Sequence, residues 1–210
     1  MAVPGLRSLR PRPAPSSLVD ADDAALVRWT LRGESRAFGA LYERHADRVF
    51  RYLHFRTRDT DLAHDLAHDV FLSALKSLPR LEHPERFGGW LMRIAHNRLV
   101  NHWERAANRF GGPAWEEVDG TDAMQPGRPA GMTASAPDPA PTADDRLHVA
   151  ALLADRLSPV QHQIVALRFA GGLSLRETAE IVGCTEAAAK QHQYRALRQI
   201  RDWLELGEKP

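Results

Sequence analysis

The sequence contains a single cysteine, Cys184, so an internal disulfide and a zinc cluster of several thiolates are both excluded. No apolar run approaches the roughly 18–20 residues that a membrane-spanning helix needs. Residues 1–17 carry Arg7, Arg10 and Arg12 but lack the apolar stretch of a secretory signal. We therefore expect a cytoplasmic protein.

Motifs for common enzyme chemistry are also missing. The chain has neither a phosphate-binding glycine loop nor the sharp serine turn of a hydrolase. His64 and His68 stand four residues apart, near Asp65 and Asp69, and this spacing can bind a divalent metal. The pattern lacks the metalloprotease glutamate and an obvious third ligand. We therefore expect no metal and no cofactor, and a metal-dependent enzyme built on the two histidines is a rival hypothesis.

One long segment divides the chain. Phe110–Asp145 is rich in proline, glycine, alanine, serine and threonine, and it is too long for an ordinary loop, which indicates a flexible linker. Its first half is acidic. A segment with this negative charge can occupy a groove built for nucleic acid. The alternative is that the segment is an inert spacer. The predicted organisation is a disordered tail (1–19), an N-terminal domain (20–109), the linker (110–145) and a C-terminal domain (146–207).

Apolar residues recur at helical spacing in both domains, whereas strand signals are weak. The sequence therefore predicts an all-α fold of two small helical domains. The N-terminal domain contains three apolar stripes at helical spacing. The first consists of Phe38, Leu41, Tyr42, Val49, Phe50 and Leu53, and the second of Ala63, Leu66, Ala67, Val70, Ala74 and Leu78. The third consists of Leu91, Ile94, Ala95 and Leu99.

The C-terminal domain has the start and stop signals of a helix-turn-helix. Ser158 and Ser174 each begin a capping box, with Gln161 or Glu177 three residues later. The first helix should end at Gly171-Gly172 and the second at Gly183, because glycine readily adopts the left-handed conformation that ends helices. Thr185 should cap a third helix. Two helices separated by a tight glycine turn are typical of DNA-binding proteins.

The third helix separates an apolar side from a polar one. Ala189, Ala196, Leu197, Ile200 and Leu204 form the apolar side, in which Gln193 is an exception. Small, amide and cationic side chains on the other side suit the major groove of DNA, although a solvated face on a structural hairpin would have the same composition. That polar face consists of Ala187, Lys190, Gln191, Tyr194, Arg198 and Arg201, with Arg195 at its edge.

A second polar row lies on the predicted helix within Asp61–Leu78. An exposed leucine in an acidic row can anchor a protein interface, and the alternative is again a solvated face. The row comprises Asp61, Asp65, His68, Asp69, Leu72 and Lys76, spaced three and four residues apart.

The segment Arg86–Arg109 mixes aromatic and cationic side chains. Melted nucleic acid needs both, because bases stack on rings while cations follow the backbone. The Pro- and Gly-broken loop before it could hold an extruded base. Core tryptophans beside a solvated face are the alternative, above all for Trp90. The polar residues are Arg93, His96, Asn97, Asn101, Arg105 and Arg109, interleaved with Trp90 and Trp103.

Several of these motifs together resemble extracytoplasmic-function sigma factors of bacterial RNA polymerase. The matching stretches are AFGALYERH, DLAHDVFLSALKSL, GWLMRIAHNRLVNHW and LSPVQHQIVALRFAGGLSLRETAEIVGCTEAAAKQHQYRAL, in that order. The resemblance covers nearly everything except the tail and the linker. It implies sigma region 2 in residues 20–109, sigma region 4 in residues 146–207, and a protein that is not an enzyme by itself.

The resemblance also implies partners and site residues. The partners are core RNA polymerase, through the beta-prime clamp helices and the beta subunit, and promoter DNA; no small-molecule substrate is expected. Polymerase binding maps to Asp61, Asp65, His68, Asp69 and Leu72, and reading of the minus-ten element to Arg86, Trp90, Arg93, His96, Asn97, Asn101 and Arg105. Reading of the minus-thirty-five element maps to Thr185, Glu186, Ala187, Lys190, Gln191, Tyr194, Arg195 and Arg198.

Two further expectations accompany this reading. Family members are commonly restrained by an anti-sigma factor, often at the membrane, although no residue here proves such a partner. A transcription factor that uses the same helix-turn-helix without polymerase is the other rival. Its mark would be tight, specific duplex binding by the isolated protein, and the N-terminal domain, which offers no evident ligand pocket, argues against it.

Overall fold

The computed structural model describes residues 15–110 and 157–207, which form helices and no strand. The predicted all-α fold is therefore confirmed for these residues. Most of the predicted tail and nearly all of the predicted linker lie outside them. In the N-terminal domain the elements are α1 (Pro15–Asp20), α2 (Asp23–Leu31), α3 (Ser35–Thr57), α4 (Thr60–Ser77), the 3-10 turns η1 (Leu78–Arg80) and η2 (Pro84–Arg86), and α5 (Phe87–Phe110).

The tail differs from its prediction at its last residues. Pro15–Asp20 is helical, and Leu18 is buried against the core of the N-terminal domain. Proline is tolerated in the first turn of a helix, and the apolar side chain of Leu18, three residues later, gives the short helix a contact with the core.

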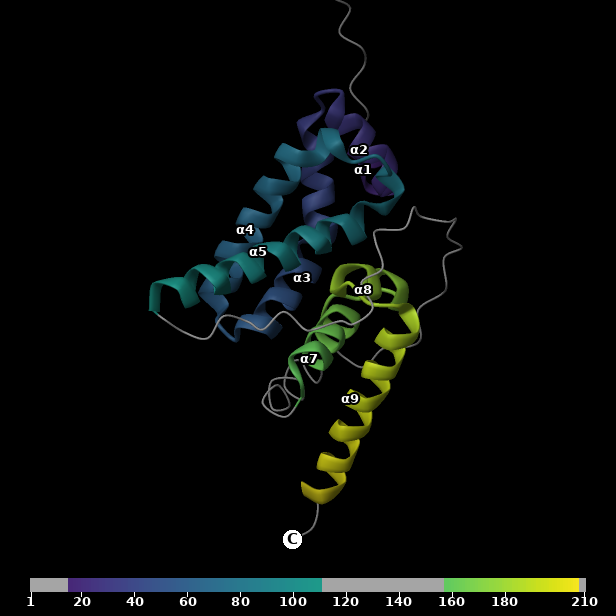
Figure 1. The fold of residues 1–210 in the computed structure, drawn as a ribbon. Coiled ribbons are helices and arrows are strands. Elements are labelled where there is room, and N and C mark those ends of the chain that lie inside the picture. Colours follow the sequence, from purple (N-terminus) through teal and green to yellow (C-terminus); the bar gives the residue numbers. More distant parts are fainter. Residues whose placement is uncertain (1–14, 111–156, 208–210) are drawn as a thin grey trace, which may run out of the picture.

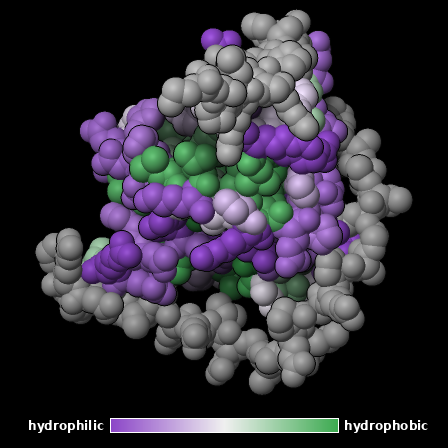
Figure 2. Space-filling model, turned by 90° about the horizontal axis from the view of Figure 1, so that it is seen from above, coloured by the Kyte–Doolittle hydropathy of each residue, from purple (hydrophilic) through white to green (hydrophobic). Residues whose placement is uncertain are grey.

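Seen from the end where α1 and α2 lie, apolar side chains gather at the centre of this face with polar ones around them (Figure 2).

The long helices of the N-terminal domain pack around one apolar core. Asp59 caps α4 by accepting a 3.0 Å hydrogen bond from the backbone of Leu62, and Arg58 ends α3 in the left-handed conformation. Most residues of the three predicted stripes are buried, including Leu41, Leu53, Val70 and Leu99, all with no exposed surface. Tyr42 is the exception, because it is 48% exposed. Periodicity therefore located most of this core.

In the C-terminal domain, α7 (Pro159–Val165) continues through a π-helical segment, η3 (Ala166–Ala170), and is followed by α8 (Leu175–Val182) and α9 (Glu186–Gly207). Both predicted capping boxes are present. Gly183 ends α8 with φ 79°, and Thr185 accepts a 3.2 Å hydrogen bond from the backbone of Ala188. The predicted helix-turn-helix is confirmed.

Two residues of α9 depart from the predicted pattern. Leu197, assigned to the apolar side, is 39% exposed, because the seam with the preceding helices is centred on Ala189 and Ala196. Gln193, the polar exception on the apolar side, has a hydrogen-bond partner there: its side-chain oxygen accepts a 2.9 Å hydrogen bond from Arg168 of η3. The amide thus satisfies a cation that also donates to the backbone of Leu173.

The two domains lie against each other (Figure 1). One apolar cluster contains Leu53, Phe87 and Met92 of the N-terminal domain together with Leu167 and Leu173 of the C-terminal domain. The segment η3 contacts α3, and α8 contacts α5. The linker connects two domains that, in this structure, share part of their core.

The turn at Gly183 gives a direct test of the backbone argument. A Cβ at Gly183 would meet nothing within 4 Å, so Gly183→Ala should destabilise the protein only through the strain of φ 79°, by about 1 kcal/mol. Gly39→Ala is the matched control, because Gly39 lies inside α3 with equally open space and should stabilise the protein by about 1 kcal/mol. Urea unfolding of both variants measures the two opposite changes.

Candidate nucleic-acid interface

The acidic row on α4 is exposed along its whole length. Asp61, Asp65, His68, Asp69 and Leu72 all lie on the surface, while Leu66 and Val70 of the same helix are buried. Because side chains three and four positions apart share one face of a helix, the structure brings these five residues together. The amphipathic pattern of α4 placed them correctly.

Apolar side chains flank this row. Leu72 is 42% exposed, Leu75 is 44% exposed and Tyr42 of α3 is 48% exposed. Phe71 is buried and its ring lies 4.6 Å from that of Tyr42. Sequence reasoning missed Leu75 and Tyr42 as surface residues; the spacing of Leu72 and Leu75, three residues apart, was the available signal. The acidic and apolar groups form a mixed surface, which suits a protein partner.

The polar residues of α5 separate into an open group and a covered group. Asn97, Asn101 and Arg105 are exposed toward the end of the described helix. Arg86, Trp90 and His96 are partly buried, and Arg93 is exposed but faces α8. The structure therefore does not present all seven predicted residues on one free surface.

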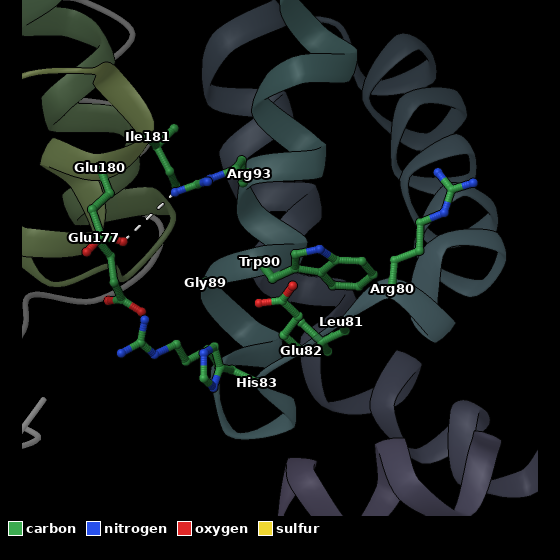
Figure 3. A pocket seen from close by; sticks show the side chains of 11 residues that line it. Arg80, Leu81, Glu82, His83, Gly89, Trp90, Arg93, Glu177, Glu180 and Ile181 are labelled. Atoms are coloured by element: carbon green, nitrogen blue, oxygen red, sulfur yellow. Dashed lines mark ion pairs between the residues drawn. The ribbon is translucent and has the colours of Figure 1, made fainter. Parts of the chain in front are cut away.

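Arg86, Trp90 and Arg93 line a cleft of about 310 Å³ between the two domains. Arg80, Glu82 and His83 contribute from the loop before α5, while Glu177, Glu180 and Ile181 contribute from α8 (Figure 3). The rings of Trp90 and Phe87 lie 5.8 Å apart, and Trp90 packs partly against the core. The side chain of Trp90 therefore both packs against the core and lines the cleft.

His96 lies in the contact between the domains. One ring nitrogen lies 3.0 Å from the hydroxyl of Tyr52, and the other lies 3.1 Å from the side-chain nitrogen of Gln163 on α7. Burial, reinforced by the cation of Arg56, lowers the pKa of His96 to about 4. Burial also raises the pKa of Tyr52 to about 12. His96 is thus neutral near pH 7 and is held by two polar contacts.

The polar face of α9 is exposed. Thr185, Glu186 and Ala187 begin the helix on the surface, and Lys190, Gln191, Tyr194, Arg195 and Arg198 continue the exposed row. Tyr194 is 66% exposed. Arg198 lies 3.7 Å from Asp202, a contact between exposed side chains that holds the guanidinium only weakly. The eight predicted residues therefore share one end and one face of α9.

Both domains match families of known proteins. Residues 41–109 match the family description Sigma-70 region 2, and residues 150–200 match Sigma-70, region 4. The ECF RNA polymerase sigma factor SigL of Mycobacterium tuberculosis is 31% identical over 191 residues, which cover 87% of this chain and 98% of SigL. The chain belongs to the extracytoplasmic-function (ECF) sigma factor family.

Two other proteins are similar to this chain. The ECF RNA polymerase sigma factor BldN of Streptomyces coelicolor is 34% identical over 187 residues, which cover 86% of this chain and 66% of BldN. The solved structure of CnrH in complex with the cytosolic domain of CnrY has a TM-score of 0.55 at 23% identity, and the match covers 88% of this chain and 97% of that chain. The second likeness shows the shared fold.

The family regions agree with the structural domains. Sigma region 2 includes most of α3, all of α4 and nearly all of α5, and it therefore contains both the acidic row and the aromatic-cationic helix. Sigma region 4 includes the complete helix-turn-helix of α8 and α9 up to Ile200. The helices α1 and α2 precede the match and complete the packing of the ECF sigma region 2 domain.

Other candidate chemistry finds no support among residues 15–110 and 157–207. No group of three or more histidine, cysteine or acidic residues could hold a metal there, and the ring of His64 stacks on Phe50 at 4.4 Å. Cys184 is half-buried beside the second apolar cluster, and burial raises the pKa of its thiol. The same residues include no helix long and apolar enough to cross a membrane.

Proposed function

We propose that this ECF sigma factor binds core RNA polymerase, recognises the minus-thirty-five and minus-ten elements of its promoters, and helps to melt the DNA at the start site. The observation that carries the proposal is the presence in one chain of three different surfaces. These are the acidic and apolar face of α4, the aromatic and cationic face of α5, and the cationic face of α9. A protein that only binds duplex DNA needs the third alone.

The face of α4 is the proposed polymerase contact. Asp65 and Asp69 supply negative charge, and Leu72 supplies an apolar anchor that is already exposed to a partner. Charged groups around an apolar centre give an interface both specificity and affinity. Asp61 and His68 extend the same face, which we assign to the beta-prime clamp helices.

Promoter reading is divided between the two domains. Lys190, Arg195 and Arg198 of α9 are placed to meet phosphates or guanine edges in the major groove, while Gln191 can pair with adenine. Asn97 and Asn101 of α5 offer amides to separated bases. Because one linker joins both readers, two weak contacts act together through their effective concentration.

The cleft before α5 is the proposed site for an extruded promoter base. Trp90 supplies an aromatic surface, and Arg80, Arg86 and Arg93 supply cations around it. A base that has left the duplex needs both stacking and hydrogen bonds, and the phosphates beside it need positive charge. Capture of such a base would stabilise the melted strand.

The remaining expectations concern partners and setting. The protein is not an enzyme by itself, and it works in the cytoplasm as a subunit of RNA polymerase. An anti-sigma factor is a further expected partner, which would compete with polymerase or with DNA for these surfaces. The acidic linker lies outside the described residues, and its role in the polymerase stays a prediction.

The decisive test is run-off transcription with purified core polymerase. Adding the protein should produce transcripts from a limited set of genomic fragments, and core polymerase alone should produce none of them. A complete lack of new transcripts across a genomic fragment library would falsify the proposed function. Tight, specific duplex binding by the protein alone would favour the transcription-factor alternative.

Loss of one phosphate contact should change the salt dependence of DNA binding. Lys190→Ala removes an exposed cation at the centre of the α9 face, so the slope of log affinity against log salt should fall by about 1. Gln199→Ala, at an exposed position of α9 outside the proposed reading set, should leave the slope unchanged. Filter binding of the holoenzyme to promoter fragments across a salt series measures both variants.

A further inference from the structure

A cluster of charged side chains joins α1 and α2 to α3. The carboxylate of Asp23 on α2 accepts a 2.6 Å hydrogen bond from Arg44 and a 2.8 Å hydrogen bond from Nε2 of His45, which are both on α3. Arg44 also donates to the backbone carbonyls of Val19 and Ala21, at 3.3 and 2.8 Å. Because carbonyls at the end of a helix have no partner within it, these bonds fix the end of α1 as well.

Asp23 controls the orientation of His45. Burial raises the pKa of the Asp23 carboxyl, but the hydrogen bonds from His45 and Arg44 have the larger combined effect, so its pKa lies below the ordinary value. The carboxylate can only accept hydrogen bonds, and Nε2 of His45 therefore donates to it. His45 is buried, with 7% of its surface exposed, so this bond sets the direction in which the ring points.

The His45 ring contacts the start of α5. It meets the ring of Phe87 edge-on, with centroids 5.3 Å apart and an angle of 63° between the planes. A Cβ on Gly88 would lie 3.3 Å from Cε1 of His45, so a larger residue would crowd the ring. Phe87 has no exposed surface, and its ring lies 5.8 Å from that of Trp90. One row of contacts therefore leads from Asp23 to Trp90.

The helix α2 also supports the loop that supplies cations to the cleft. It contacts both 3-10 turns of this loop, η1 and η2. Leu26 of α2 has no exposed surface and lies in the same apolar cluster as Leu78 of η1. Arg80, at the end of η1, lines the cleft together with Trp90 (Figure 3). The position of α2 against α3 therefore determines where both the loop and the aromatic ring lie.

We propose that Asp23, Arg44 and His45 are positioning residues for promoter melting. They hold α2 against α3. Through Phe87 and the loop, they keep Trp90 and its neighbouring cations in the geometry that captures an extruded base. This inference rests on the function proposed above for the cleft, and it extends the melting machinery to α2, which precedes sigma region 2 in the chain.

Positioning and stability can be separated because they affect different steps. Capture of a base stabilises DNA only where the strands are apart, so its loss matters most for a template that the holoenzyme must melt. A template whose minus-ten region is mismatched is already open, and transcription from it also shows that a variant is folded. The measured quantity is the ratio of run-off transcription from a fully paired promoter fragment to that from its mismatched version, at saturating holoenzyme.

Asp23→Asn keeps the shape and one acceptor oxygen of the side chain but removes its charge. Because hydrogen bonds to charged groups are the stronger ones, the row of contacts should loosen. Transcription from the paired template should fall by about 10-fold, and transcription from the mismatched template by less than about threefold. Permanganate reactivity of the minus-ten thymines should fall in parallel on the paired template. Affinity for immobilised core polymerase should be unchanged, since Asp23 lies on α2 and not on the α4 face.

Asp22→Ala is the matched control in the same helix. Asp22 caps α2 by accepting a 2.7 Å hydrogen bond from the backbone of Ala25, so its replacement removes one charge and weakens α2 but leaves the bonds to α3 in place. Urea unfolding should show a destabilisation comparable with that of Asp23→Asn, while the ratio of the two templates should stay within about twofold of the unmodified protein. A second variant, His45→Gln, keeps a donor for Asp23 but lacks the ring beside Phe87, and it should lower the ratio as Asp23→Asn does.

Equal losses on the two templates, or no loss on the paired template, overturn the positioning role if Asp23→Asn shows them. A ratio lowered to the same extent by Asp22→Ala also overturns it, because any weakening of α2 would then suffice. An unchanged ratio with His45→Gln would mean that the ring contact with Phe87 does not carry the effect, and it has the same consequence. Absence of transcripts with the unmodified protein is a different result, which contradicts the proposed function itself.

Discussion

Replacing Asp65 and Asp69 together by alanine should abolish most promoter-dependent transcription while leaving the fold intact. Both side chains are exposed on α4, and their replacement by alanine improves helix propensity. Anchoring residues at the centre of an interface contribute about 2–4 kcal/mol each, so affinity for core polymerase should fall by roughly 1,000-fold or more. Surface-immobilised core polymerase measures this loss directly.

A second acidic pair on the surface controls for charge. Glu43 and Asp47 are exposed on α3 with the same four-residue spacing as Asp65 and Asp69. Glu43→Ala with Asp47→Ala removes the same two charges and should leave polymerase affinity within about twofold. Normal binding by the Asp65 and Asp69 double variant would mean that the polymerase contact lies on another face.

Acidification should destabilise the folded protein through His96. The pKa of this ring is lowered to about 4, from an ordinary 6.5, because burial and the neighbouring Arg56 both disfavour the charged form. The pKa of this base is lower in the folded state than in the unfolded state. The neutral ring therefore contributes to folding stability above the unfolded pKa, and this contribution is lost as pH falls. The loss begins near pH 6.5 and should reach about 2 kcal/mol by about pH 5.

The variant His96→Gln isolates this contribution. Glutamine keeps two polar groups for Tyr52 and Gln163 but cannot titrate, so its unfolding free energy should change less between about pH 7 and about pH 5. Urea unfolding of both proteins at the two pH values measures the difference. Equal pH dependence in the two proteins would mean that His96 is protonated as easily in the folded chain as in the unfolded one.

Local rules predicted the helices and their ends. The capping boxes at Ser158 and Ser174 and the left-handed turn at Gly183 depend on residues only three or four positions apart, so they can be read directly from the sequence. The same applies to the exposed rows on α4 and α9, because the helical period alone decides which side chains share a face.

Long-range contacts determined what local rules missed. Gln193 interrupts an apolar seam in the sequence, but its partner Arg168 lies on another element. Leu75 and Tyr42 are exposed because nothing in the described structure covers them, although their residue types favour burial. His96 is found between the domains only when α7 is placed against α5.

By itself the sequence determined an all-α protein with two domains, a helix-turn-helix and three polar surfaces, because helical periodicity and capping act over a few residues. The tertiary structure decided how those surfaces meet. Arg48 contacts Gly171 across 123 positions of the chain, and Glu180 faces Arg93 from the other domain. Such contacts depend on how the two domains pack against each other. The local sequence pattern of one domain does not predict which of its faces the other domain covers.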